Sequence, residues 1–257
     1  MRPSQNRDVR LCGVTALTFI ASVAATVAWC KSMAAMPGMD MPGGWTMTMT
    51  WMRLPGQTWL EAGGTFLAMW TVMMVAMMLP VFAPELHRFR RAARRSRAMP
   101  TIGFAAGYFG VWAAVGLVLF PVGVGFNALA MRSEMLSEAT PLLGGLVVMI
   151  AGALQFTSWK TRRLVRCRHE EDCCGSQRVM PRDALRAGAQ LGLKCAYCCA
   201  SLTAVLLVIG VMDLLVMALV TIAISAERLT SSVNVARVVG AGMLTSGAFL
   251  VSRAILV

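Results

Sequence analysis

Long runs of apolar residues dominate the chain, and short clusters of charged residues separate them. A spanning helix needs about 20 mostly apolar residues. Six runs reach this length, at residues 11–30, 60–84, 101–130, 141–159, 196–222 and 238–257. The third run contains Pro121, which favours a kink or a break in its helix. The pattern predicts an all-α, polytopic membrane helix bundle of about six transmembrane helices, with residues 1–257 as a single integral membrane domain.

The first run allows a second interpretation. It follows Arg2, Arg7 and Arg10, as the apolar core of a signal peptide would. Its apolar segment is longer than the usual core of about 7–15 residues. A retained helix is therefore the prediction, with a cleaved signal peptide as the alternative.

Basic residues are concentrated in alternate loops. Of the 24 Lys and Arg residues, 19 fall in residues 1–10, 85–100 and 160–194 or at Arg253. Basic residues next to spanning helices remain on the cytoplasmic side. The distribution therefore predicts that both termini are cytoplasmic (N-in/C-in) and that residues 160–194 form a basic, Cys-containing cytoplasmic loop. It also accounts for the net charge of +12 without nucleic acid as a partner.

Residues 31–59 form the predicted first extracytoplasmic loop, which is rich in methionine. Its segment "SMAAMPGMDMPGGWTMTMTWM" has seven methionines in 21 residues. Thioethers are soft ligands that select Cu(I) over hard cations, and they need no deprotonation. Packing does not require methionines among prolines and glycines. The candidate metal ligands in this loop are Met36, Met39, Met41, Met47 and Met49.

The second apolar run continues the methionine pattern. Met73 and Met77 in "MWTVMMVAMMLP" are four residues apart and share one helix face. They are candidate copper ligands, in line with the preceding loop. The alternative is packing, because methionine fills irregular core space well.

Cysteines cluster on the predicted cytoplasmic side, where thiols stay reduced and bind metals more often than they form disulfides. Cys195, Cys198 and Cys199 fall within a 100° arc of one helix face. Together with Cys167 from the preceding loop, they would hold Cu(I), or zinc as the alternative ion. Small residues that allow close helix packing are the competing explanation. Cys12 and Cys30 are expected to pack as small hydrophobes.

Three polar residues fall within or near the apolar runs: Gln155, Asp213 and Glu227. Asp213 follows Cys195 by 18 residues, which is five helical turns and places both on one face of a continuous helix. An acid in the middle of a span is costly and often marks a functional path. The alternative is an acid satisfied by a neighbouring helix, for example by Gln155. Glu227 is expected at the outer end of the same helix.

Several motifs, among them "MPGGWTMTMTWMRLPGQTW", "MWTVMMVAMMLP" and "CAYCCASLTAVLLVIGVMDLLVMALVTIAISAERL", resemble a bacterial family of predicted metal-binding integral membrane proteins. The resemblance covers roughly residues 36–235 and implies metal binding in the bacterial inner (cytoplasmic) membrane. Its shared positions correspond here to the Met-rich loop and to Met73, Met74, Met77, Met78, Pro80, Gln155, Lys160, Cys167, Cys195, Cys198, Cys199 and Glu227. The chain departs from the family at Arg163, where a Cys is frequent, and at Asp213, where Asn is common.

The leading hypothesis is a Cu(I)-binding membrane protein for copper uptake, trafficking or delivery, whose partners are the lipid bilayer, the metal ion and a protein donor or acceptor or a larger membrane complex. One alternative is a copper-containing subunit of a membrane oxidoreductase or monooxygenase, which the two histidines, His87 and His169, disfavour. The other is a thiol–disulfide protein, which would need its cysteines on the oxidising side. No P-loop or catalytic motif is present, so no catalytic residue is predicted.

Overall fold

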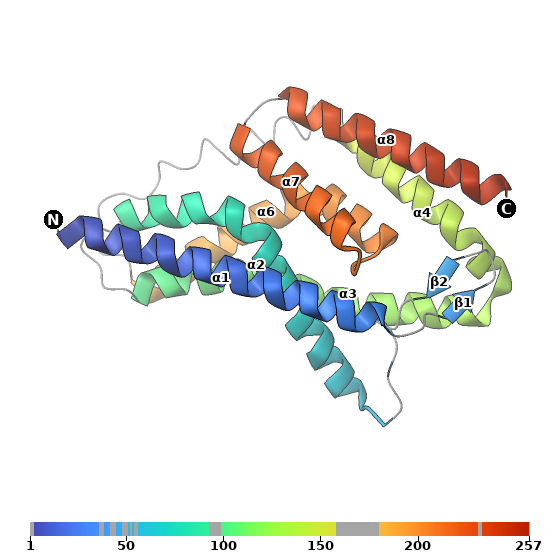
Figure 1. Cartoon of the computed structure of the whole chain (residues 1–257), viewed down its shortest axis with the longest axis horizontal. Helices are drawn as coiled ribbons and strands as arrows, with labels where there is room; N and C mark the ends of the chain where they lie inside the picture. Colours follow the sequence, from blue (N-terminus) through green and yellow to red (C-terminus); the bar gives the residue numbers. More distant parts are fainter. Residues whose placement is uncertain are drawn as a thin grey trace.

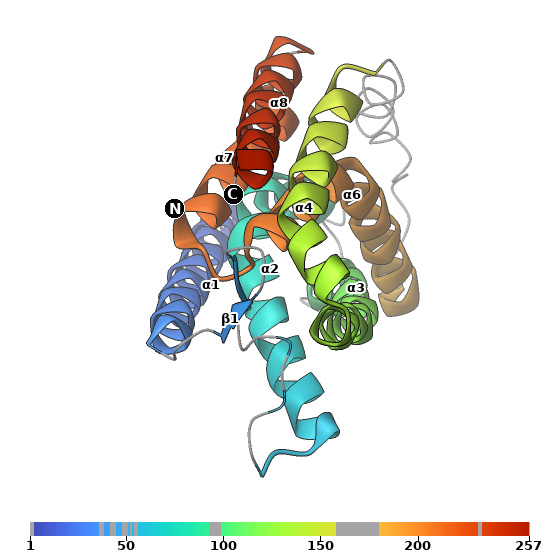
Figure 2. The same ribbon diagram turned by 90° about the vertical axis from the view of Figure 1, so that its right-hand side faces the viewer.

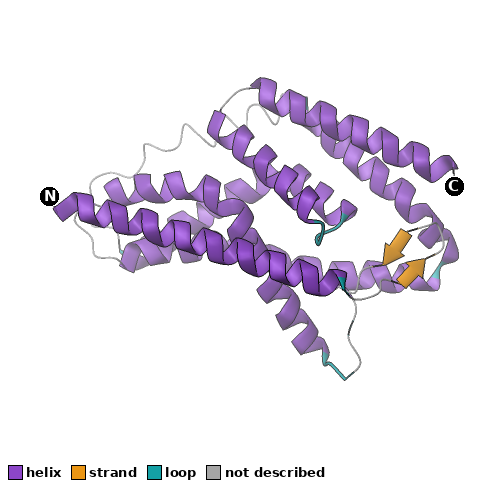
Figure 3. Ribbon diagram, in the orientation of Figure 1, coloured by secondary structure: helices purple, strands orange, loops and turns teal. Residues whose placement is uncertain are grey.

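The computed structural model describes residues 3–35, 39–41, 45–47, 51, 53, 56–92, 99–157, 180–230 and 233–256. Within these ranges the chain forms seven helices and one hairpin (Figures 1 and 3). The helices are α1 (Pro3–Ala34), α2 (Trp59–Ala92), α3 (Met99–Arg132), α4 (Glu134–Gln155), α6 (Pro181–Ile209), α7 (Leu214–Thr230) and α8 (Val233–Leu256). The hairpin consists of β1 (Met39–Met41) and β2 (Trp45–Met47). The predicted all-helical bundle is confirmed.

Six of these helices are long and apolar enough to cross a membrane, judged by length and composition. The qualifying segments are Val9–Met33, Trp59–Arg91, Pro100–Arg132, Glu134–Gln155, Arg182–Ile209 and Asn234–Leu256. Most of them extend beyond the predicted apolar runs, because amphipathic turns continue the helices past their apolar centres. The helix at Pro121 continues without interruption to Arg132, so the predicted break does not occur.

The predicted fifth helix, at residues 196–222, is two helices. Helix α6 ends at Ile209, and Gly210 follows with a φ of 141°, a conformation that residues with a side chain rarely adopt. Asp213 then starts α7, because its Oδ1 accepts hydrogen bonds from the backbone N–H groups of Leu215 (2.8 Å) and Val216 (3.1 Å). The prediction that Asp213 shares a helix face with Cys195 is therefore wrong. Asp213 is an exposed helix cap.

The boundaries of the predicted loops also change. Helix α6 begins at Pro181, so the last 14 residues of the predicted loop 160–194 are helical. The Met-rich loop contains the antiparallel hairpin of β1 and β2, in which Met39 pairs with Met47 and Met41 with Trp45. The remainder of both loops lies largely outside the described residues.

Helix α2 is the central helix of the bundle. It packs against α1, α3 and α7, and α3 packs in turn against α6 (Figure 2). Its apolar span is the most buried of the six. A helix that is apolar on all sides is stable in such a central position, which explains why α2 carries bulky apolar residues around its whole circumference.

Helices α3 and α6 lie so close that their backbones touch. A methyl group added at Gly188 would collide with the Phe104 carbonyl oxygen, and one added at Gly107 would collide with the Leu185 carbonyl oxygen. The residue numbers of the contacts rise together along the two helices, since Gly188 faces Phe104 and Gly192 faces Tyr108. The two helices are therefore parallel, and the absence of two side chains permits the close approach.

The division of the fifth helix reverses the path of the remaining chain. Helix α7 turns back along α6, and Glu227 near its end contacts Gln155 at the end of α4. Helix α8 then runs antiparallel to α4, with Gly240 against Gln155 and Val251 against Gly145. The two termini consequently lie at opposite ends of the bundle (Figure 1). The orientation of the termini relative to a membrane (N-in/C-in) stays a prediction.

Candidate metal centre

Cys195 and Cys199 form a pair of buried thiols one helical turn apart on α6. Their side chains are 0% and 3% exposed, and their sulfur atoms are 3.9 Å apart. Two thiolates that share one ion at about 2.3 Å lie roughly 3.8–4.0 Å apart when the angle at the metal is tetrahedral to trigonal. The observed separation fits this requirement. Both residues are free thiols, and Cys198 is buried on the same turn.

Tyr108 connects this thiol pair to the central helix. Its hydroxyl group donates a hydrogen bond to the Cys195 sulfur at 3.1 Å, and the residue is buried. Its ring stacks on Phe82 of α2, with 4.5 Å between the ring centroids. Tyr108 on α3 therefore bridges the methionine-rich helix and the cysteine-bearing helix, and it supplies a donor that favours the thiolate form of Cys195.

The pair also lies near a positive charge. Arg228, in the last turn of α7, interacts with Cys195 and lies within electrostatic range of Cys199. A buried anion is unfavourable unless it is paired. Two thiolates with one monovalent cation carry a net charge of −1, which the guanidinium group of Arg228 would balance. Arg228 lies near the thiol pair because the chain reverses at Gly210 and α7 runs back along α6.

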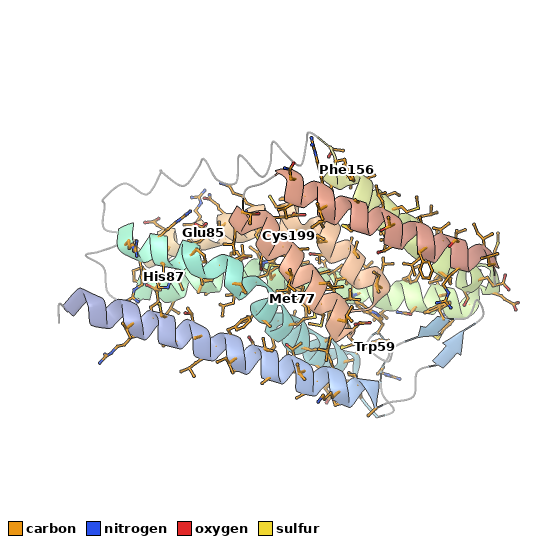
Figure 4. All side chains as sticks on the ribbon, turned by 45° about the horizontal axis from the view of Figure 1, so that its top comes forward. Trp59, Met77, Glu85, His87, Phe156 and Cys199 are labelled. Carbon is orange, nitrogen blue, oxygen red and sulfur yellow. The ribbon has the colours of Figure 1, made fainter. Side chains whose placement is uncertain are left out.

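The methionines of the central helix belong to the same buried core as the thiol pair. Five of them are at most 6% exposed: Met69, Met73, Met74, Met77 and Met78. Met77 and Cys199 both lie in the middle of the bundle (Figure 4). Burial on all sides of α2 means that packing accounts for the position of these methionines. Metal binding by Met73 and Met77 stays a prediction.

The Met-rich loop is attached to the bundle by two tryptophans. The indole N–H of Trp45 donates to the Ser137 carbonyl oxygen at 3.0 Å, and Trp51 packs on Phe66 of α2 with 4.9 Å between ring centroids. Backbone pairing in the hairpin brings Met39 opposite Met47 and leaves Met41 on the same strand. Met36 and Met49, as well as Cys167 of the other predicted loop, lie outside the described residues.

Gln155, Glu227 and Met243 form a second buried polar group near the end of α4. The Gln155 side-chain N–H donates to the Glu227 carboxylate at 3.0 Å and approaches the Met243 sulfur at 3.9 Å. The predicted partner Asp213 is absent from this group, and Glu227 lies at the Gln155 end of the bundle and not at the end of the 210–213 turn. Among the described residues, the side-chain amide oxygen of Gln155 (Oε1) has no hydrogen-bond partner.

Tyr108, Arg228 and Met243 are the functional candidates that the sequence did not reveal. No spacing rule connects Tyr108 or Arg228 to the cysteines, because they come from different helices. The two remaining cysteines differ from each other. Cys30 is buried, 4.0 Å from the Met212 sulfur, whereas Cys12 is exposed and does not pack as expected.

Across the part of the chain that the structure describes, no three His, Cys, Asp or Glu side chains converge on one point. Structural zinc sites take four such ligands. The described thiol pair therefore gives no support for zinc. It suits an ion that accepts fewer and softer ligands.

Residues 67–250 match the model of the PpoB2 family, which is described as a copper chaperone. The matched region contains most of α2, all of α3, α4, α6 and α7, and most of α8, including the thiol pair, Tyr108 and Arg228. No curated protein and no solved structure matches the chain.

Proposed function

The chain belongs to the PpoB2 family of copper chaperones, and we propose that it is a multi-pass membrane protein that holds Cu(I) on Cys195 and Cys199 for delivery to a partner protein. The observation that carries this proposal is the 3.9 Å separation of two buried thiol sulfurs beside a tyrosine hydroxyl and a guanidinium group. Thiolates select soft monovalent ions, and the low-polarity surroundings keep water and oxidants away from them.

The outer surface of the bundle supports a membrane location. Leu117, Val118 and Val122 on α3 and Phe249 on α8 are all more than 60% exposed. Side chains of this kind would contact lipid in a bilayer, whereas a soluble protein rarely displays such large apolar patches. The inner bacterial membrane is part of the proposal.

The order of ligands along the bundle supports a direction of transfer. Thioethers in the Met-rich loop would collect Cu(I), the buried methionines of α2 would hold it in passage, and the thiol pair would receive it. Each step exchanges a weaker ligand for a stronger one, because thiolate carries a charge that thioether lacks. The gradient therefore favours movement away from the hairpin and toward the end of the bundle that holds the N-terminus.

A copper-counting experiment tests the central site. The protein is purified in detergent without oxygen, loaded with Cu(I), and analysed by native mass spectrometry and elemental analysis. We expect the Cys195→Ser/Cys199→Ser variant to bind one copper ion fewer than the unmodified protein, because serine hydroxyls do not replace thiolates as ligands for a soft ion.

The matched control is Cys30→Ser, which removes a buried thiol outside the pair and should leave the copper content unchanged. Equal copper content in the double variant and in the unmodified protein would exclude the thiol pair as the binding site.

A further inference from the structure

Cys12 and His87 form a second pair of metal-binding groups, which the proposed central site does not use. Cys12 lies on α1 and His87 near the end of α2, and the Cys12 sulfur is 3.6 Å from the His87 Nε2 atom. Cys12 is exposed and His87 is partly exposed. His87 lies toward the end of the bundle that carries the N-terminus (Figure 4).

We propose that Cys12 and His87 form a separate Cu(I) site from which copper leaves the protein. The binding of a soft ion by this pair stands on its own geometry, whereas its use as an exit site rests on the proposed function. The site differs from the central one in its chemistry, because it joins one thiolate to one imidazole, and in its exposure.

The separation of the two atoms fits a shared ion. A thiolate at about 2.3 Å and an imidazole nitrogen at about 2.0 Å from one metal are roughly 3.5–3.7 Å apart at tetrahedral to trigonal angles. The observed 3.6 Å falls within this range. A linear arrangement would need more than about 4 Å. The geometry therefore points to a bent pair with at least one coordination position left for a further ligand.

The identity of the ion follows from the surroundings. No third His, Cys, Asp or Glu completes a metal site among the described residues, so a four-coordinate zinc site is not formed. Cu(I) is stable with two or three ligands, and both thiolate and imidazole suit copper. The open position would accept a thiolate from an incoming acceptor protein, which then removes the ion by ligand exchange.

The position of the Cys12–His87 pair along the bundle suits a later step of copper transfer than the position of the thiol pair. Phe104 contacts both Phe89 of α2 and the backbone at Gly188 of α6. Phe89 and Gly188 therefore lie at about the same height along the bundle axis. Cys195 lies seven residues, or about 10 Å, further into the bundle than Gly188. His87 lies two residues, or about 3 Å, from Phe89. The Cys12–His87 pair is thus about 7 Å closer to the end of the bundle than the thiol pair.

Binding at this site involves ligand exchange and no redox change. The Cys12 thiol releases its proton to solvent as its sulfur bonds to Cu(I), and His87 bonds to the ion through the Nε2 lone pair. The oxidation state of copper stays the same. The bound pair is neutral, because one thiolate balances one monovalent cation, and it therefore needs no arginine near it.

The test uses the full-length protein with Cys195→Ser/Cys199→Ser as the background, so that the central site is removed. Cu(I) is added without oxygen, and X-ray absorption and native mass spectrometry identify the ligands and the number of ions. We expect a sulfur and a nitrogen ligand in this background. The nitrogen signal should disappear in His87→Gln, and Cys12→Ser should bind one ion fewer.

The chain has only two histidines, so His169→Gln is the matched control and should keep the nitrogen signal. Thermal unfolding in detergent verifies that each variant is folded. A variant with a lowered midpoint is replaced by the unmodified chain in which exposed Cys12 is blocked by methylthiolation, a mixed disulfide that a reductant removes. Unchanged stoichiometry and spectra in His87→Gln and Cys12→Ser would show a thiol–imidazole hydrogen bond only and would overturn this site. That outcome says nothing against the central site. If copper is lost only in Cys195→Ser/Cys199→Ser and not in His87→Gln or Cys12→Ser, the Cys12–His87 site is overturned and the central site is supported.

Discussion

At the level of single residues, Tyr108 shows how a neighbour from another helix defines the character of a thiol. Its hydroxyl group is directed at the Cys195 sulfur, and stacking on Phe82 holds its ring in place. Hydrogen bonds to charged groups contribute about 1.5–3 kcal/mol, which is more than bonds between neutral groups contribute. The bond therefore stabilises the ionised form of Cys195 that the proposed copper site requires.

Tyr108→Phe removes this hydrogen bond and retains the ring. We expect the affinity for Cu(I) to fall about tenfold, equivalent to about 1.4 kcal/mol, because the thiolate loses a donor in a buried setting. Competition with a chromogenic Cu(I) chelator measures the change. Tyr197→Phe on exposed Tyr197 of α6 serves as the control and should leave the affinity unchanged. An equal affinity for Tyr108→Phe and the unmodified protein would mean that the hydroxyl group has no role in copper binding.

At the level of helices, one glycine and one aspartate change the architecture. Gly210 ends α6 and Asp213 caps α7, so a single apolar run becomes a helical hairpin. Arg228 reaches the thiol pair only through this reversal. The parallel helices α3 and α6 also depend on glycine, because Gly188 allows the Phe104 carbonyl group to approach.

Gly188→Ala tests the contact between α3 and α6. The added methyl group meets backbone atoms of Phe104, which do not move aside easily, so we expect destabilisation of about 1–3 kcal/mol. Thermal unfolding in detergent measures the difference. Gly242→Ala is the matched control, since a methyl group there meets no atom within 4 Å and alanine favours the helix by about 0.5–1 kcal/mol. A neutral or stabilising effect of Gly188→Ala would contradict the close approach of the two helices.

At the level of the whole molecule, the division of the fifth apolar run into α6 and α7 changes the number of helices between the two termini. We propose that α7, which is shorter than the six candidate spans, also crosses the membrane; seven passages with a cytoplasmic N-terminus would place the C-terminus on the opposite side. In this arrangement Arg228 and Arg237 would lie on the cytoplasmic side and Arg253 on the other, so that 20 of the 24 Lys and Arg residues would be cytoplasmic. This distribution follows the positive-inside rule better than the 19 of the six-helix arrangement.

Reporter fusions test this topology in intact cells. A phosphatase that is active only outside the cytoplasm should be active when fused after residue 257 and inactive when fused after residue 231. A fluorescent protein that folds only in the cytoplasm should give the reverse result. An inactive phosphatase at residue 257 would favour six passages and place both termini in the cytoplasm.

The apolar pattern by itself determined the class of the protein. Runs of 20 or more apolar residues have few stable alternatives to long helices, and six helices of the required length are present. The local spacing of Cys195 and Cys199 was equally readable, because residues four apart on a helix are neighbours whatever surrounds them. The copper-related role also followed from these soft ligands and agrees with the family of the chain.

Only the tertiary structure decided which helices bring their side chains to the thiols. Tyr108 and Arg228 reach Cys195 from α3 and α7, and Cys12 meets His87 across 75 positions of sequence. Such contacts depend on the crossing of whole helices, which no local pattern encodes. The reversal at Gly210 was also hidden, because hydropathy sums over a window and does not register one residue with a positive φ. That single backbone angle decides where Glu227 lies and at which end of the bundle the chain finishes.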